Sequence, residues 1–283
     1  MSVVVNTNVD SIRIQNHLTA STNKLSVAMQ RMSSGSRITC AKDDASGCVI
    51  SARMCVQLDG NKICQQNIQN GNSLLSTTEG NLDVVLDNVT RIRDLTLQAK
   101  NGTYSSDEIA AMQKEVGQRI NEIDRIADSA SFSDLTLFGG SLATNGATLQ
   151  VGQNQGTENV ITASKEIFEG IKFSALTGVG GNFNLGSLGA YTDLDTAVGK
   201  LDDAIDAITE RKALIGSAQA RLESALDTLT TQYTNLSSAN SIIKDADIAS
   251  EASKFTQNQI LQQVSTSLLA QANQSPSIAL SLL

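Results

Sequence analysis

Four cysteines lie close together in the sequence and are the residues best suited to covalent or metal chemistry: Cys40, Cys48, Cys55 and Cys64. Thiolates bind zinc or join in disulfides. A zinc site is not expected, because the chain has no Cys-x-x-Cys pair and its single histidine, His17, is remote in the sequence.

A disulfide within one chain is not expected either. On a helix, Cys48 and Cys55 share a face but lie about 10 Å apart along the axis, beyond the Cα separation of about 7 Å that a disulfide tolerates. Cys64 falls on the face opposite to Cys55. We therefore interpret the cysteines as small buried apolar residues. The alternative is contacts or bridges between neighbouring chains.

Motifs for catalysis are missing. There is no Gly-x-Ser-x-Gly elbow, one histidine cannot supply a His-Glu-x-x-His motif, and the segment Gly178 to Gly181 lacks the third glycine of a dinucleotide loop. One acidic set lacks the spacing of a calcium loop, and we interpret it as a solvated helix face: Asp195, Asp202, Asp203 and Asp206. We predict no enzyme activity, no cofactor and no metal.

The composition favours long helices. The chain of 283 residues has no Trp, 3% aromatic residues and one proline, Pro276, near its end. A net charge of -8 disfavours binding to nucleic acid, whose phosphates would be repelled. No stretch is apolar and long enough to insert into a membrane, and the first residues lack the features of a secretory signal.

Apolar residues at heptad spacing predict three helices in the first half of the chain. The first spans about Val9 to Met32, and its apolar face is formed by Leu18, Leu25, Met29 and Met32. Residues 33–47 interrupt it with serine, glycine and charge. A second, longer helix follows, with two lines of residues spaced by seven: Leu75, Leu82, Val89 and Thr96, and Thr78, Val85, Ile92 and Ala99. Asn101 and Gly102 end it.

A third helix begins at a cap formed by Ser105 or Ser106, with Asp107 and Glu108 in its first turn. It ends before Phe132. Its apolar face comprises Ile109, Met112, Val116, Ile120 and Ile123. The region from residue 139 to 199 holds 12 of the 20 glycines and two short alternating stretches, at 147–151 and 158–162, which predict a small β or loop insertion.

The strongest pattern in the chain is an unbroken heptad, which predicts a coiled-coil helix with one seam of core-facing residues: Leu194, Leu201, Ile208, Ile215, Leu222, Leu229 and Leu236. Its companion line is apolar at both ends and polar in the middle: Val198, Ile205, Lys212, Gln219, Leu226, Tyr233 and Asn240. Antiparallel packing on the two earlier helices is the simplest arrangement.

We therefore predict a mainly α fold, an elongated antiparallel helical bundle or coiled coil built from both chain ends, with a small β-hairpin or loop insertion. The expected domains are 1–44 with 237–283 for the terminal helices, 45–137 with 190–236 for the bundle, and 138–189 for the insertion. The last residues, Phe255 to Leu283, carry no charged side chain, yet Ile260, Val264 and Leu268 keep a helical rhythm. Such a tail needs a protein partner.

Motifs at both ends resemble bacterial flagellin. The N-terminal block contains Val5-Asn6-Thr7-Asn8, Ser33-Ser34-Gly35, Arg37-Ile38, Ala41 and Asp43-Asp44-Ala45-Ser46-Gly47. The C-terminal block contains Lys244-Asp245-Ala246-Asp247, Ile260-Leu261-Gln262-Gln263, Leu269-Ala270-Gln271-Ala272-Asn273-Gln274 and Leu280-Ser281-Leu282-Leu283. The resemblance covers about residues 1 to 140 and 190 to 283.

The resemblance implies a secreted, extracellular filament subunit whose paired terminal helices line a central tube, and it leaves periplasmic or sheathed flagella open. We expect Gln, Asn and Ser of the last helix to face a wet channel while its apolar residues face protein. The residues expected to pack in the filament core are Leu18, Leu25, Met29, Met32, Ile260, Leu261, Val264 and Leu268. Because a lone terminal helix has one apolar stripe and ordering costs about 1 to 2 kcal/mol per residue, we expect folding to be coupled to assembly.

The resemblance also implies partners besides further copies of the chain: the flagellar export apparatus, a C-terminal export chaperone, the filament cap and the hook-filament junction proteins. Toll-like receptor 5 recognises some members of the family, and the matching residues here are Arg91, Leu95, Gln98 and Glu115. Packing between subunits is the alternative role for them. A hook-filament junction adapter of the same architecture is the alternative function.

Overall fold

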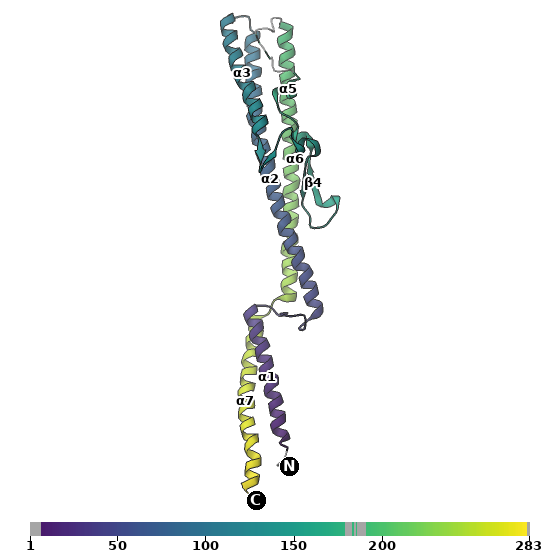
Figure 1. The fold of residues 1–283 in the computed structure, drawn as a ribbon, viewed down its shortest axis with the longest axis vertical. Helices are drawn as coiled ribbons and strands as arrows, with labels where there is room; N and C mark the ends of the chain where they lie inside the picture. The colour runs from purple at the N-terminus through teal and green to yellow at the C-terminus, as the bar shows by residue number, and fades with distance from the viewer. Residues whose placement is uncertain (1–6, 179–182, 184, 186–190, 282–283) are drawn as a thin grey trace. The chain divides into compact units, whose positions relative to one another are not determined.

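The computed structural model describes residues 7–178, 183, 185 and 191–281 (Figure 1). Its helices are α1 (Val9–Ser34), α2 (Ala45–Lys100), α3 (Ser106–Ser129), α4 (Ser141–Asn145), α5 (Phe173–Thr177), α6 (Tyr191–Lys244) and α7 (Ile248–Ser281). Its strands are β1 (Ser131–Phe132), β2 (Leu135–Thr136), β3 (Ala147–Gln150) and β4 (Val160–Ala163), with 3-10 turns η1 (Thr157–Asn159) and η2 (Lys165–Phe168). The predicted mainly α bundle with a small β insertion is confirmed.

The chain forms two compact units. Unit 1 contains residues 1–58 and 234–283, and unit 2 contains residues 59–233, so the boundary falls within α2 and within α6. The three functional domains expected from the sequence stay a prediction.

Local sequence signals set the helix ends. The side chain of Asn8 accepts a hydrogen bond from the amide of Ser11 at the start of α1, and Gly35 ends the helix with a φ of 68°. Asp44 accepts the amide of Gly47 at the start of α2, at 2.9 Å. The predicted cap of α3 is Ser105, which forms a reciprocal capping box with Glu108.

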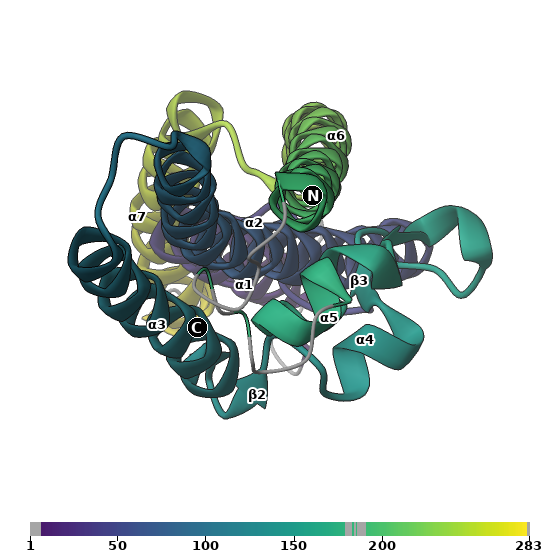
Figure 2. The same cartoon turned by 90° about the horizontal axis from the view of Figure 1, so that it is seen from above.

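The bundle of unit 2 consists of α2, α3 and α6, which lie side by side (Figures 1 and 2). Both lines of residues predicted for the core face of α2 are buried, seven of the eight at 0% exposure and Ala99 at 8%. The predicted face of α3 also packs on this core, with Val116 and Ile123 fully buried. Burying each such side chain contributes about 1.5 to 3 kcal/mol.

The heptad seam of α6 is buried from Leu194 to Leu229 and reaches 0% exposure in its middle, whereas Leu236 is half-buried. The companion line differs from the prediction. The more deeply buried residues are Ala197, Ala204 and Ala218, one position before the predicted line, whose described members are half-buried or exposed. Small side chains at these positions fit α6 closely against its neighbours.

Ion pairs show that α6 runs antiparallel to α2. Lys212 of α6 pairs with Asp83, Asp202 pairs with Arg93, and Asp195 pairs with Lys100. From one ion pair to the next, the residue number rises along α2 by the same amount as it falls along α6. This is the relation expected for two antiparallel helices. Two residues of the acidic set, Asp195 and Asp202, therefore form ion pairs with α2.

The insertion is anchored on the bundle. Strands β3 and β4 pair antiparallel, with Ala147 opposite Ala163 and Gln150 opposite Val160. A Cβ atom added to Gly71 of α2 would lie 2.5 Å from Leu149 of β3, so the hairpin approaches the helix closely. Phe168 and Phe173 are buried in the bundle core at 0% and 1% exposure. None of the described helices is long and apolar enough to cross a membrane.

Candidate assembly surface

The terminal helices α1 and α7 form an antiparallel pair within unit 1. Gln262 donates to Thr22 at 3.2 Å, and Asn8 donates to the carbonyl of Ala272 at 2.7 Å. At the other end of the pair, the amide of Arg37 donates to the carbonyl of Lys244 at 2.7 Å. Hydrogen bonds thus join the two chain ends from Asn8 and Ala272 to Arg37 and Lys244.

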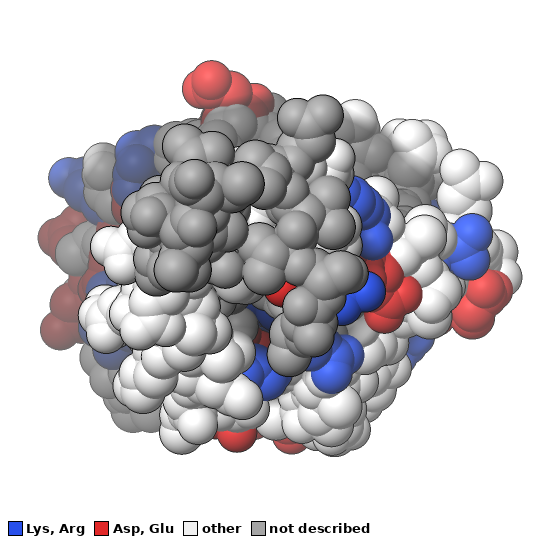
Figure 3. Space-filling view, turned by 90° about the horizontal axis from the view of Figure 1, so that it is seen from below, with Lys and Arg blue, Asp and Glu red and all other residues white. Residues whose placement is uncertain are grey.

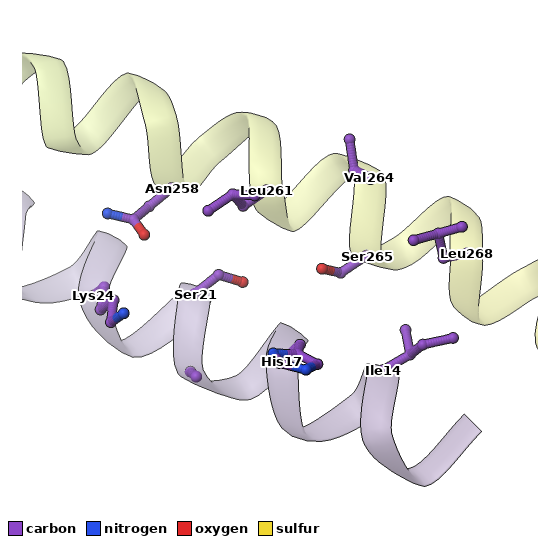
Figure 4. A pocket seen from close by; sticks show the side chains of 10 residues that line it. Ile14, His17, Ser21, Lys24, Asn258, Leu261, Val264, Ser265 and Leu268 are labelled. Atoms are coloured by element: carbon purple, nitrogen blue, oxygen red, sulfur yellow. The ribbon is translucent and has the colours of Figure 1, made fainter. Parts of the chain in front are cut away.

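Polar side chains make much of the contact that α7 forms with α1. Asn258, Gln262 and Ser265 are half-buried on this side of α7, and Figure 4 shows Ser265 pointing towards α1 while Val264 points away from it. The expectation that such residues face a wet channel is therefore wrong for these three within the single chain. Because polar residues occupy much of the contact, several large apolar residues of α7 stay exposed.

Large apolar side chains remain exposed along the pair. Their exposed fractions lie between 40% and 55%, and they are Val9, Ile12, Val27, Met29, Ile248, Ile260, Leu261, Val264 and Leu268. Five of the eight residues expected to pack in the filament core are in this group, and the other three, Leu18, Leu25 and Met32, are half-buried. The buried residues of α1 are Ser21 and Ala28, which are too small to form a core.

A groove follows one side of the pair. Its first part has a volume of about 280 Å³ and is lined by Ile14 and His17 of α1 and by Leu261, Val264 and Leu268 of α7 (Figure 4). A second part, of about 450 Å³, shares Lys24, Asn258 and Leu261 with the first. The two parts therefore adjoin each other, and their apolar lining comes from both helices, with Val27 and Ala28 of α1 in the second part.

Charge is unevenly distributed along the pair. Glu251 is 5% exposed and lies 2.8 Å from the ammonium of Lys254 and 3.7 Å from the guanidinium of Arg31. Beyond Lys254, α7 has no charged residue. Figure 3 shows uncharged described residues across much of the view from below, with groups of Lys, Arg, Asp and Glu between them.

The cysteines have different environments. Cys64 is 4% exposed in the core of unit 2, so it fits the interpretation as a small apolar residue, and the alternative of a bridge to another chain is wrong for it. Cys40 is exposed, which contradicts burial, whereas Cys48 and Cys55 are half-buried. Bridges between subunits through Cys40, Cys48 or Cys55 stay a prediction.

The residues expected to contact a receptor do not form one exposed surface. Leu95 is 2% exposed in the bundle core, so its assignment to a surface is wrong. Arg91 of α2 makes two hydrogen bonds to Glu115 of α3, at 2.9 Å and 3.3 Å, and these bonds lower the pKa of Glu115. Gln98 is exposed. The expectation that Arg91, Gln98 and Glu115 contact the receptor stays a prediction.

Comparison with known protein families finds a match for the N-terminal part and another for the C-terminal part of the chain. Residues 5–143 match the bacterial flagellin N-terminal helical region, and residues 198–283 match the bacterial flagellin C-terminal helical region. The chain belongs to the bacterial flagellin family. It is therefore a structural subunit of a flagellar filament.

Individual flagellins match nearly the whole chain. A flagellar filament core protein of Treponema maltophilum is 35% identical over 96% of this chain and 96% of its own length. A flagellin of Halalkalibacterium halodurans is 34% identical over 99% of this chain and 100% of its own. A structure assigned as a flagellar hook-associated protein from Vibrio parahaemolyticus has a TM-score of 0.58, covers 71% of this chain and 99% of that one, and at 15% identity shows a shared fold alone.

The flagellin family is structural and not enzymatic, and the flagellum of which it is a component is extracellular. The sequence prediction missed the polar residues of α7 that contact α1. Asn258, Gln262 and Ser265 share a half-buried helix face with the apolar residues Phe255 and Leu269, at an alternating spacing of three and four, but a search for apolar residues alone does not reveal the polar members of this face.

Proposed function

We propose that this chain polymerises through the apolar surface of its α1–α7 pair and that the pair becomes stably folded only in the filament. The observation that carries this proposal is the exposure, near one half, of nine large apolar side chains on a pair without a core of its own. Covering each of them fully would contribute about 1 kcal/mol, roughly half of the value for a fully buried side chain. Summed over the pair, this gain from apolar burial offsets part of the conformational entropy that the two helices lose when they become ordered.

The contact between subunits must be heterologous. A surface that paired with the same surface of a second copy would close a dimer, whereas a filament requires two different surfaces that leave a further contact open. The absence of charge on α7 beyond Lys254 favours such stacking, because a charge there would be repeated at close distance along the polymer.

The substitution Leu268→Glu tests the proposal. Leu268 is 46% exposed, so the monomer should keep its helicity, but the carboxylate would be desolvated in the polymer, and we expect filaments to be lost. Polymerisation is measured by electron microscopy and by sedimentation. Ser253→Glu is the matched control, since it adds the same charge to an exposed position of α7 next to Lys254 and should leave filaments intact. Normal polymerisation of the Leu268 variant would refute the assignment of this surface.

Electron microscopy of the unmodified chain separates the filament subunit from the junction adapter. A filament subunit grows into long uniform filaments when it polymerises alone, whereas an adapter present in few copies does not. The match over nearly the full length of flagellins supports the first role.

We further propose that the export apparatus and a C-terminal chaperone receive the chain before assembly. The exposed residues Ile260, Leu261 and Val264 provide an apolar helix face for that chaperone. The filament cap and the hook-filament junction proteins are the partners proposed for the filament ends, and secretion to an extracellular flagellum is the proposed destination. Toll-like receptor 5 stays the proposed partner of Arg91, Gln98 and Glu115.

A further inference from the structure

Three of the four thiols line one small pocket of unit 1. The pocket has a volume of about 210 Å³ and is lined by Cys40 of the α1–α2 connection, by Cys48 and Cys55 of α2 and by Lys244 of α6. Cys40 is exposed, and Cys48 and Cys55 are half-buried. A low-molecular-weight reagent therefore has access to this pocket from solvent through Cys40.

The connection that carries Cys40 is folded onto the first turn of α2. Ile38 is 8% exposed, and a Cβ atom added to Gly47 would lie 2.7 Å from its Cδ1, so Ile38 is in contact with the residue before Cys48. The carboxylate of Asp43 accepts hydrogen bonds from the amide and the hydroxyl of Thr39, at 3.1 Å and 2.9 Å. The amide of Asp43 also donates to the carbonyl of Cys40, at 3.0 Å. These contacts hold the segment of Cys40 beside the start of α2, where Cys48 lines the same pocket.

Helix geometry excludes one of the possible pairs of thiols. Cys48 and Cys55 are both on α2 and are separated by about 10 Å along its axis, which is too far for a disulfide. The sulfur of Cys55 also accepts a hydrogen bond from the amide of Asn240, at 3.7 Å. Cys40 lies outside α2, so the fixed spacing within the helix does not apply to it, and the contacts of the connection with the first turn of α2 place it near Cys48.

We propose that Cys40 and Cys48 form a thiol–disulfide exchange site for low-molecular-weight disulfides, a role that filament assembly does not require. The thiolate of Cys40 attacks one sulfur of the reagent, its S–S bond breaks, and the first thiolate leaves and takes up a proton. The thiolate of Cys48 then attacks the sulfur of Cys40, and the second thiolate leaves in the same way. Two protein thiols are oxidised to one disulfide, and one reagent disulfide is reduced to two thiols.

The sequence makes the product easy to assign. Trypsin cleaves after Arg37, Lys42, Arg53, Lys62 and Arg91, so each cysteine lies in a peptide of its own: 38–42, 43–53, 54–62 and 63–91. The reduced full-length chain is treated with bis(2-hydroxyethyl) disulfide, a neutral probe, then alkylated and digested. We expect peptides 38–42 and 43–53 to be joined and the chain to have lost two hydrogen atoms without retaining the reagent.

Two conservative variants distinguish this site from general thiol reactivity. In Cys48→Ser the second step cannot occur, so the reagent should remain attached to Cys40. In Cys55→Ser, the matched control from the same pocket, the link between the two peptides should form as in the unmodified chain. Circular dichroism of both variants checks that the helices are retained.

The proposal would be overturned by any of three results in the unmodified chain. The reagent could remain on Cys40, Cys40 could be found mainly in a bridge between two chains, or Cys40 could fail to react. A filament that still assembles in each of these cases would leave the proposed assembly function standing, so the two proposals fail separately.

Discussion

The α1–α7 pair and the α2–α3–α6 bundle are both built from long helices, but they bury different residues. In the bundle, Leu75, Leu82 and Leu201 are at 0% exposure. In the pair, the most deeply buried residues are Ala28, Ser21 and Glu251, at 3%, 6% and 5%. The apolar residues of the bundle face one another within a single chain, whereas many of those of the pair face outward.

The difference teaches where stability resides before assembly. Apolar burial is the dominant favourable term in folding, and hydrogen bonds between polar side chains contribute about 0.5 to 1.5 kcal/mol each. The bundle therefore holds its own fold, and the pair depends on what covers its exposed face. The same amount of helix can thus be a stable scaffold in one region and an unfinished interface in the other.

We expect the largest effect on the free energy of unfolding when the same type of substitution, leucine to glutamate, is compared between the bundle and the pair. Leu82→Glu puts a carboxylate into a fully buried site of the bundle, and we expect it to lower the free energy of unfolding of the monomer by more than about 4 kcal/mol. Leu268→Glu should lower it by less than about 1 kcal/mol, since surface substitutions are usually nearly neutral. Urea unfolding of both monomers provides the measurement. Equal losses would break the distinction between the regions.

Limited proteolysis should show the same distinction without any substitution. We expect trypsin to cut the monomer first at sites in α1 and α7, such as Lys24 and Lys254, and to leave a fragment of about residues 50 to 235, because regions with few buried apolar contacts open most easily. Mass spectrometry of the early products tests this. In filaments the same sites should be protected, and protection of both ends before assembly would contradict coupled folding.

The smallest expected effect concerns acid and lies within the bundle. Hydrogen bonds from Arg91 hold the pKa of Glu115 below its ordinary value of 4.5. A carboxyl group whose pKa is lower in the folded state stabilises that state at higher pH, and this contribution is lost as the pH falls from about 4.5 through the folded pKa. Because Glu115 is 37% exposed, we expect less than about 1 kcal/mol.

The substitution Glu115→Gln removes this titration, so the free energy of unfolding of that variant should depend less on pH below about 4.5. Glu210→Gln on the exposed side of α6 serves as the matched control. An unchanged pH profile for the Glu115 variant would mean that the ion pair does not contribute to the stability of the bundle.

Sequence periodicity predicted the bundle well because its elements obey a single rule. The lines through Leu75 and Leu201 repeat every seven residues, and packing between helices requires that repeat. The cap at Ser105 follows in the same way from local chemistry, since its hydroxyl and the carboxylate of Glu108 satisfy amides that the helix leaves free.

What the sequence could not show depends on contacts between distant segments. The alanine line of α6, at Ala197 and Ala204, is deeper than the predicted companion line because how closely neighbouring helices approach decides which side chains are covered. The thiol pocket likewise requires Ile38 to pack on Gly47, which no spacing rule predicts. Burial of Leu95 corrects a surface assignment made by resemblance.

The ion pairs between α2 and α6 have a consequence for how the bundle selects one alignment. An apolar heptad matches itself at every offset of seven residues, so the hydrophobic contact alone specifies the alignment only up to that offset. The charges are not periodic. If α6 slid seven residues in the direction that brings Asp195 opposite Arg93, then Lys212 would face Ser76 and Asp202 would face Leu86. Two of the three attractive pairs would be lost. The weak surface charges therefore favour one alignment among those that the strong apolar contact alone cannot distinguish.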